Sequence, residues 1–256
     1  MITKSQIKFV NSLHQKKARK EENLFIAEGE KVVADLLNSE WKVQGVFATI
    51  DYLNTHPNEV ALMKGVEIYD VTHDELGKIS ALTTSQSILA IAEIPQEDES
   101  INFSSGLKLV LDEIKDPGNM GALLRIADWF GIEEVICSNN SVDCFNPKVV
   151  QGSMGSLFRL KVIYSDLGPL FEENLKQSKL PVYGTLLEGD NIFETELKQD
   201  AFIVMGNESN GISHEVSDYI TQALLIPNFS VGTNGKPDSL NVAVAAGIVC
   251  AQFKRI

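Results

Sequence analysis

The second half of the chain alternates between two hydrophobic patterns. Short apolar runs, which are typical of buried strands, are followed by segments in which apolar residues recur at helical spacing. The predicted strands cover residues 107–114, 134–138, 160–165, 181–187, 201–206 and 223–227, and the predicted helices cover 120–130, 167–176, 214–220 and 239–254. Strands that alternate with helices predict an α/β fold with a mainly parallel sheet covered on both faces.

The first region of the chain predicts a smaller α/β domain. Its apolar stripe at helical spacing consists of Val32, Val33, Leu36 and Leu37. The predicted strands are 42–49, 66–72 and 87–94, and a further helix covers 73–82. A polar, acidic stretch with Pro and Gly follows and is typical of a linker. We therefore expect a small domain over 1–95, a linker over 96–106 and a second domain over 107–256.

The last predicted helix is apolar almost all round between Leu240 and Cys250. Such a helix must be buried. Its many small residues let it approach another backbone closely. Burial in its own core and burial partly against a second subunit both stay open.

Charge is distributed unevenly along the chain. The net charge is −13, yet the first twenty residues contain six basic residues and no acidic one, so the rest carries −19. An acidic total argues against a nucleic-acid partner, whereas a basic arm is suited to phosphate contacts. A solvated helix face explains the arm equally well, so both interpretations stay open.

Composition limits the protein class further. With 256 residues, 44% of them hydrophobic, the chain can bury a sizeable core. No apolar stretch reaches the ~20 residues needed to span a bilayer, and the N-terminus lacks an apolar signal-peptide core. The three cysteines are scattered and predict neither a disulfide framework nor a zinc site. We expect a cytoplasmic protein that uses no metal.

The sequence lacks the residues that several common catalytic sites require. The four histidines are spread through the sequence without a neighbouring cysteine, second histidine or nucleophile. Residues 206–211 have the outer spacing of a phosphate-binding loop but lack its lysine, and no GxGxxG motif follows a strand. These features disfavour metal catalysis, Ser-His-Asp hydrolysis and the common nucleotide sites.

Three polar clusters lie where predicted strands end, which is where open α/β sheets place ligands. The residues that stand out in them are Asn119, Arg125, Glu208, Ser239 and Asn241. Most have an ordinary structural explanation, since Asn119 and Ser239 are good helix caps and Arg125 could pair with Asp128. Asn241 differs, because an amide in so apolar a helix needs a partner.

The order of these clusters resembles a known family. The clusters contain, in this order, Asn119-x-Gly121-x3-Arg125, Gly206-Asn207-Glu208-x2-Gly211, and Ile226-Pro227 with Ser239-Leu240-Asn241-Val242. Together they resemble the three motifs of the SpoU/TrmH-type RNA 2′-O-ribose methyltransferases of the SPOUT superfamily. Upstream, residues 19–20, 25–29 and 85–90 resemble the substrate-binding domain of rRNA- and tRNA-modifying members. The loop from Pro227 to Ser239 is longer than is usual in this family.

The resemblance implies both a fold and an activity. Residues 1–95 would bind the RNA substrate, and residues 107–256 would form a methyltransferase domain with a trefoil knot. The reaction would move a methyl group from S-adenosylmethionine (AdoMet) to a ribose 2′-hydroxyl in structured RNA, with 23S-type rRNA favoured. The resemblance also implies a homodimer in which a second subunit contributes to the site.

The roles that the resemblance implies for individual residues fall into three groups. Catalytic or RNA-positioning roles fall on Asn119, Arg125, Glu208, Ser239 and Asn241. Cofactor binding falls on Gly206, Ile226 and Leu240. The basic arm supplies Lys16, Lys17, Arg19 and Lys20 as candidate RNA-binding residues.

Two alternatives to an rRNA methyltransferase stay open. One is a tRNA 2′-O-methyltransferase, since the sequence does not distinguish the two RNA classes. The other is a non-catalytic RNA-binding or ribosome-assembly factor with the same fold, which the presence of Asn119, Arg125, Glu208 and Asn241 disfavours.

Overall fold

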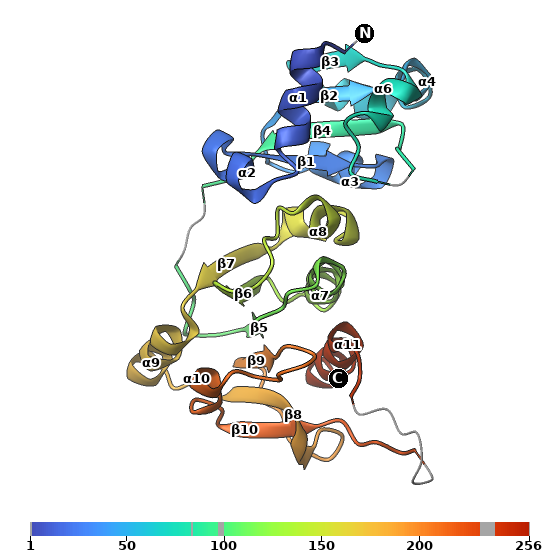
Figure 1. The fold of residues 1–256 in the computed structure, drawn as a ribbon. Coiled ribbons are helices and arrows are strands. Elements are labelled where there is room, and N and C mark those ends of the chain that lie inside the picture. The colour runs from blue at the N-terminus through green and yellow to red at the C-terminus, as the bar shows by residue number, and fades with distance from the viewer. Residues whose placement is uncertain (1, 83, 97–99, 231–238, 256) are drawn as a thin grey trace. The chain divides into compact units, whose positions relative to one another are not determined.

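The computed structural model describes residues 2–82, 84–96, 100–230 and 239–255. The chain divides into two compact units (Figure 1). The first unit consists of residues 1–96 and 143–159, and the second consists of residues 97–142 and 160–256. Each unit is built on one β-sheet with helices packed against it.

The first unit contains a four-stranded mixed sheet in the order β1-β4-β2-β3. Its strands are β1 (Leu24–Glu28), β2 (Val43–Ala48), β3 (Glu67–Asp70) and β4 (Ile88–Glu93). Its helices are α1 (Lys4–Ser12), α2 (Lys16–Glu22), α3 (Glu30–Leu37), α4 (Ile50–Thr55), α5 (Pro57–Leu62), α6 (His73–Gly77), α8 (Pro147–Gly152) and the 3₁₀ helix η1 (Ser156–Arg159). Strands β1 and β2 pair antiparallel with β4, and β3 pairs parallel with β2.

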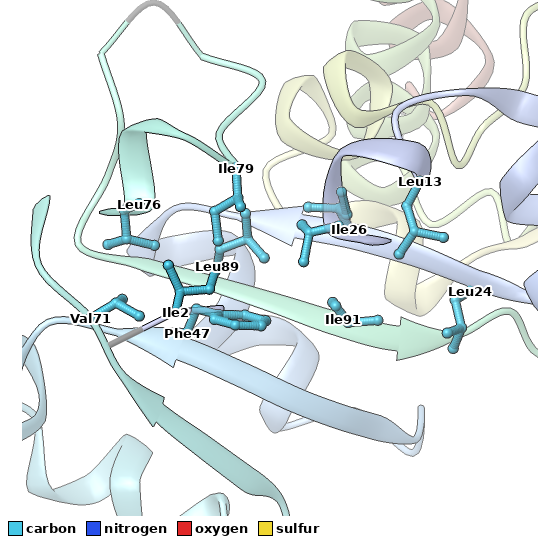
Figure 2. Packing of buried hydrophobic residues seen from close by; sticks show 11 residues of the cluster. Ile2, Leu13, Leu24, Ile26, Phe47, Val71, Leu76, Ile79, Leu89 and Ile91 are labelled. Atoms are coloured by element: carbon cyan, nitrogen blue, oxygen red, sulfur yellow. The ribbon is translucent and has the colours of Figure 1, made fainter. Parts of the chain in front are cut away.

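Strand β1 is buried on both faces, because its side chains alternate between two apolar clusters. Leu24 and Ile26 point to one face, where they join the core (Figure 2). This core consists of Ile2, Val10, Leu13, Leu24, Ile26, Phe47, Val71, Leu76, Ile79, Leu89 and Ile91. Phe25 points to the opposite face, because successive side chains of a strand alternate. On that face, the centroid of its ring lies 5.3 Å from that of Phe145 and 5.7 Å from that of Trp41.

A buried ion pair ties residues 143–159 into the first unit. The side chain of Arg19 is only 2% exposed, and its Nη2 lies 2.6 Å from Oδ2 of Asp143. Its Nη1 donates to the carbonyls of Leu13 and His14 at 2.9 and 3.0 Å. Arg19 was predicted to contact RNA, but its guanidinium is fully used inside the protein. The structure therefore gives Arg19 a structural role, and that prediction is corrected.

The second unit contains an all-parallel six-stranded sheet in the order β10-β8-β9-β5-β6-β7. Its strands are β5 (Leu107–Leu111), β6 (Glu134–Ser138), β7 (Lys161–Ser165), β8 (Val182–Asn191), β9 (Ala201–Met205) and β10 (Gln222–Leu225). Its helices are α7 (Pro117–Trp129), α9 (Leu167–Gln177), α10 (His214–Ser217) and α11 (Val242–Phe253). The predicted α/β class with a parallel sheet is confirmed. Among the described residues, no helix is long and apolar enough to cross a membrane.

Helices cover both faces of the parallel sheet. Helices α9 and α10 cover one face, where Phe171 and Val216 pack with Val110 and Phe202 of the strands. Helices α7 and α11 lie side by side on the other face (Figure 1). Because both faces of the sheet are buried, the central strands β5, β6 and β9 are largely apolar runs, which made them recognisable in the sequence.

The strand order reverses between β5 and β9. From β5 the chain moves outward to β6 and β7, and it then returns to the other side of β5 for β8, β9 and β10. Helix α7 follows β5 and helix α10 follows β9, and these helices lie on opposite faces (Figure 1). Neighbouring strands whose connections diverge in this way leave a crevice at their carboxyl ends, where such sheets bind ligands.

The predicted linker is anchored from residue 100 onward, and residues 97–99 lie outside the described residues. Lys108, which is 1% exposed, donates from Nζ to the carbonyl of Ser105 at 2.6 Å and to that of Gly106 at 3.2 Å. Burial lowers the pKa of Lys108, and the nearby Glu134 opposes the shift. The amide of Gly106 donates to Asp200 Oδ1 at 2.6 Å. The start of β5 is therefore fixed by these polar contacts.

We predict that Arg19→Ala lowers the free energy of unfolding of the first unit by about 3 kcal/mol, because it leaves a partly buried carboxylate without its partner. The chain has two tryptophans, so a Trp129→Phe background leaves Trp41 as the sole fluorescent reporter of this unit. Urea unfolding measures the loss. The exposed neighbour Lys20→Ala serves as control and should shift stability by less than about 0.5 kcal/mol. Equal midpoints for the two variants would contradict the structural role of Arg19.

Candidate active site

Three side chains from the three sequence motifs meet at the carboxyl ends of β5 and β9. Asn119 donates from Nδ2 to Glu208 Oε1 at 2.8 Å. Asn241 donates from Nδ2 to the same Glu208 oxygen at 2.8 Å and to Asn119 Oδ1 at 2.9 Å. The amide of Val242 lies 3.4 Å from Glu208 Oε1. We call Asn119, Glu208 and Asn241 the amide–carboxylate cluster.

Asn119 can join this cluster because another residue caps its helix. The cap of α7 is Asp116, whose Oδ1 accepts from the amide of Asn119 at 2.8 Å, and Pro117 occupies the first helical position. Proline is favoured there because its missing N–H would have no partner in the helix. The interpretation of Asn119 as the helix cap is therefore wrong. Its side chain is left free to reach Glu208.

Asn241 caps α11 and contacts the cluster at the same time. Its Oδ1 accepts from the amides of Ala243 and Val244 at 3.0 and 3.3 Å. This contact turns Nδ2 toward Glu208, which is the partner that an amide in so apolar a segment requires. Ser239 was the predicted cap, but the helix begins three residues later, at Val242.

Glu208 is presented by a tight loop after β9. The amide of Asn207 donates to the carbonyl of Gly211 at 2.9 Å, and the amide of Gly211 donates back at 2.8 Å. A Cβ atom on Gly206 would lie 2.4 Å from the main chain of Gly211 and Ile212. Only glycine fits at this position, because a backbone clash cannot be relieved by rotating a side chain.

The other predicted residues do not join the cluster. Arg125 is exposed on α7, and no hydrogen bond or ion pair links it to another described residue. Gly206 and Ile226 directly follow β9 and β10 and are half-buried. Ser239 and Leu240 are exposed just before Asn241.

The structure shows a bulge in β8 that the sequence did not predict. Where β8 pairs with β10, the register passes from Gly184↔Ala223 to Asp190↔Leu224. Residues 185–189 therefore bulge out of the ladder at the carboxyl edge of the sheet. The pattern alone placed residues 185–187 at the end of a strand that covered 181–187. It gave no sign of the bulge, because a bulge of this kind depends on the partner strand.

A polar crevice of about 280 Å³ is also present in the second unit. It is lined by Asp112, Glu113, Ser138, Asn139, Asn140, Ser165, Asp166, Leu167, Ser213, Glu215 and Val216. None of the predicted catalytic residues is in its lining. We therefore base the candidate site on the hydrogen-bonded cluster.

The chemical groups at the site are amides, one carboxylate and one guanidinium. Within the described ranges, no set of three or more His, Cys, Asp or Glu residues lies close enough to hold a metal ion. All three cysteines are buried, and burial raises the pKa of Cys250 to about 12, so its thiol stays protonated. The cluster can therefore bind and orient polar groups, and it offers no cysteine nucleophile.

The remaining residues of the basic arm are on the surface of the first unit. Helix α2 exposes Lys16, Lys17 and Lys20. The Nζ atom of Lys17 lies 3.7 Å from Oε1 of Glu21. Helix α2 has no acidic residue in its first turn and no side-chain cap, so Lys16 and Lys17 oppose the helix dipole. Such charges are unfavourable for the helix itself and remain available to an anionic partner.

Sequence profiles of two known families match the chain. The profile of the SpoU rRNA Methylase family matches residues 106–251, which is more than half of the sequence. The chain belongs to the SpoU rRNA methylase family. The profile of the MRM3-like substrate binding domain matches residues 4–90. The resemblance inferred from the three motifs is thereby confirmed.

Several known proteins are similar to this chain over nearly its whole length. The 23S rRNA (guanosine(2553)-2′-O)-methyltransferase RlmP of Bacillus subtilis is 30% identical over 246 residues, which are 95% of this chain and 94% of the relative. A TrmH-family protein from Porphyromonas gingivalis is 34% identical and has a TM-score of 0.85, covering 100% of this chain and 99% of its own. An AdoMet-bound rRNA methyltransferase from Sinorhizobium meliloti is 26% identical with a TM-score of 0.85, covering 100% and 96%.

We predict that Asn241→Ser keeps the cap of α11 whereas Asn241→Ala loses it. Serine and asparagine are similar N-caps, and alanine costs about 1 kcal/mol. Hydrogen exchange at the amides of Ala243 and Val244 should therefore be about fivefold faster in the alanine variant of this SpoU-family protein. Equal exchange in the two variants would show that Asn241 does not cap the helix.

Proposed function

We propose that this protein transfers a methyl group from AdoMet to a ribose 2′-hydroxyl of 23S-type rRNA in the cytoplasm. The observation that carries the proposal is the amide–carboxylate cluster, because it joins side chains from all three motifs within 2.9 Å of one another. RlmP of Bacillus subtilis, named for this reaction, and the AdoMet-bound structure from Sinorhizobium meliloti support the choice of reaction and cofactor.

The carboxyl edge of the sheet fits AdoMet. Gly206 carries no side chain, so the main chain after β9 can approach a ligand closely. Ile226 and the 45%-exposed Leu240 offer apolar surface for an adenosine ring. We assign these three residues to the cofactor, together with the bulge formed by residues 185–189. When bound, AdoMet supplies a methyl group activated by its sulfonium charge.

Glu208 and Arg125 orient the attacking hydroxyl in this proposal. The Oε1 atom of Glu208 is occupied by the cluster, whereas Oε2 takes no hydrogen bond from any described residue and can accept one from the 2′-hydroxyl. A guanidinium has hydrogen-bond donors and no acceptor, so Arg125 serves as a donor and not as a base. Correct placement of hydroxyl and methyl groups can supply much of the rate enhancement.

The RNA must present an unstacked nucleotide, because proteins recognise specific RNA mainly in loops, bulges and ends. We assign Lys16, Lys17 and Lys20 to contacts with its phosphates. Such contacts give an affinity that falls as salt rises and depends little on sequence.

We further propose that two copies form a homodimer through the outer faces of α7 and α11. Val244 is 53% exposed and Trp129 is 85% exposed, and Ala251 is exposed on the same outer side of α11 as Val244. Large exposed apolar surfaces mark interaction sites. Arg125 lies one turn before Trp129 on α7 and would then approach the partner subunit.

We predict that the protein methylates an rRNA fragment in an AdoMet-dependent assay and that Arg125→Lys lowers kcat at least about tenfold, since an ammonium cannot reproduce a bidentate guanidinium contact. The exposed Arg255→Lys is the matched control and should retain full activity. Near-normal turnover of Arg125→Lys would refute the orienting role. A calorimetric titration in which AdoMet releases no heat would favour the non-catalytic factor, and methylation of tRNA alone would favour the tRNA enzyme.

We predict that Val244→Asp converts a dimer into a monomer of 28.2 kDa, because a charge in an apolar interface loses its hydration. Light scattering after gel filtration measures the mass. Leu175→Asp is the control, since Leu175 is similarly exposed, at 48%, but lies on α9 across the sheet. Loss of the dimer in both variants, or in neither, would argue against this interface.

A further inference from the structure

Two side chains outside the predicted site tie its loops together. We propose that Asn207 and Asp112 are positioning residues for methyl transfer, which hold Glu208 in place against Asn119. The inference rests on the proposed function. The loops concerned are the β5 loop, residues 112–116, and the β9 loop, residues 206–213.

The first tie is the side chain of Asn207, which bonds both across to the β5 loop and within its own loop. Its Nδ2 donates to the carbonyl of Glu113 at 2.9 Å. Its Oδ1 accepts from the amides of Ser209 and Asn210 at 2.9 and 3.1 Å. Glu208 lies between Asn207 and Ser209, so its backbone is fixed on both sides.

The Glu113 carbonyl that receives this bond belongs to a strained residue. Glu113 has a φ of 56°, which lies in the left-handed region that is unfavourable for a residue with a side chain. Its amide donates to Ser138 Oγ at 2.8 Å. Three residues later, Asp116 caps α7 and binds the amide of Asn119. The tie therefore connects the backbone beside Glu208 with the segment that carries Asn119.

The second tie is the buried carboxylate of Asp112. Asp112 is 2% exposed, and its Oδ2 accepts from the amide of Ser213 at 2.7 Å. A buried carboxylate is costly unless it is hydrogen-bonded, so this contact strongly favours one position of Ser213. Asn207 thus holds the start of the β9 loop and Asp112 holds its end.

The ties matter because the cluster depends on short contacts between separate segments. A misplacement of 1 Å can cost roughly 100-fold in rate. The side-chain hydrogen bonds of Asn207 and Asp112 go to Glu113, Ser209, Asn210 and Ser213, and not to Asn119 or Asn241, so each side chain acts through the loop that presents Glu208. Their removal should lower kcat and leave the affinities for AdoMet and RNA close to normal.

A double-mutant cycle with Glu208→Gln tests this for Asn207. We expect Asn207→Ala to lower kcat by about 10- to 100-fold, with the AdoMet Kd and the KM for RNA changed by less than about twofold. In the Glu208→Gln background the same change should lower kcat by less than about twofold further. Asn210→Ala is the control, because Asn210 contributes only its main-chain amide. An unchanged kcat, or a full additional loss in the Glu208→Gln background, would overturn the proposal.

Rescue by a conservative variant tests Asp112. Asp112→Asn keeps an oxygen that accepts from Ser213 and should retain kcat within about threefold, whereas Asp112→Ala should lose about tenfold or more. If the alanine variant does not fold, Asp112→Asn still tests the proposal. A loss of kcat above about tenfold in Asp112→Asn would overturn the positioning role of Asp112.

Hydrogen exchange provides a readout that does not require activity. The amides of Ser209 and Asn210 should exchange faster in Asn207→Ala, and the amide of Ser213 should exchange faster in Asp112→Ala. Faster exchange with no methylation by the wild-type protein would overturn the proposed function and leave the ties intact. Unchanged exchange would overturn the ties themselves.

Discussion

One carboxylate oxygen organises the candidate site. Glu208 Oε1 accepts from the side-chain amides of Asn119 and Asn241, and the main-chain amide of Val242 points toward it. These donors come from segments more than 100 residues apart in the sequence. Hydrogen bonds to a charged acceptor are the stronger kind, and one lost partner leaves the others poorly satisfied. The position of each motif is therefore linked to the other two.

The strand order makes this meeting possible. Strands β5 and β9 are neighbours although about 90 residues separate them, so the loops that follow them lie side by side. Helix α11 runs beside α7 and brings Asn241 to the same edge. The side chains at this edge are polar, and their hydrogen bonds fix their orientations. Such a site suits a reaction whose rate depends mainly on how the reacting groups are positioned.

The sequence predicted the strands and the polar clusters because both are local features. Buried parallel strands are apolar runs, and the clusters stand at their ends. Which residue caps each helix was harder to predict, because Asp116 and Asn119 are both suitable residues. The burial of Arg19 was not predictable, since its partner Asp143 lies 124 residues away. The trefoil knot and the roles of the site residues remain predictions, and residues 231–238 of the Pro227–Ser239 loop lie outside the described residues.

The most direct measurement of the central claim is a map of 2′-O-methylated nucleotides in total RNA, made by mass spectrometry from cells with and without the protein. We expect one methylated ribose of 23S rRNA to disappear without the protein, to return with the wild-type chain and to stay absent with Glu208→Gln. An identical methylation map in all these cells would contradict the assignment of the site to ribose methylation.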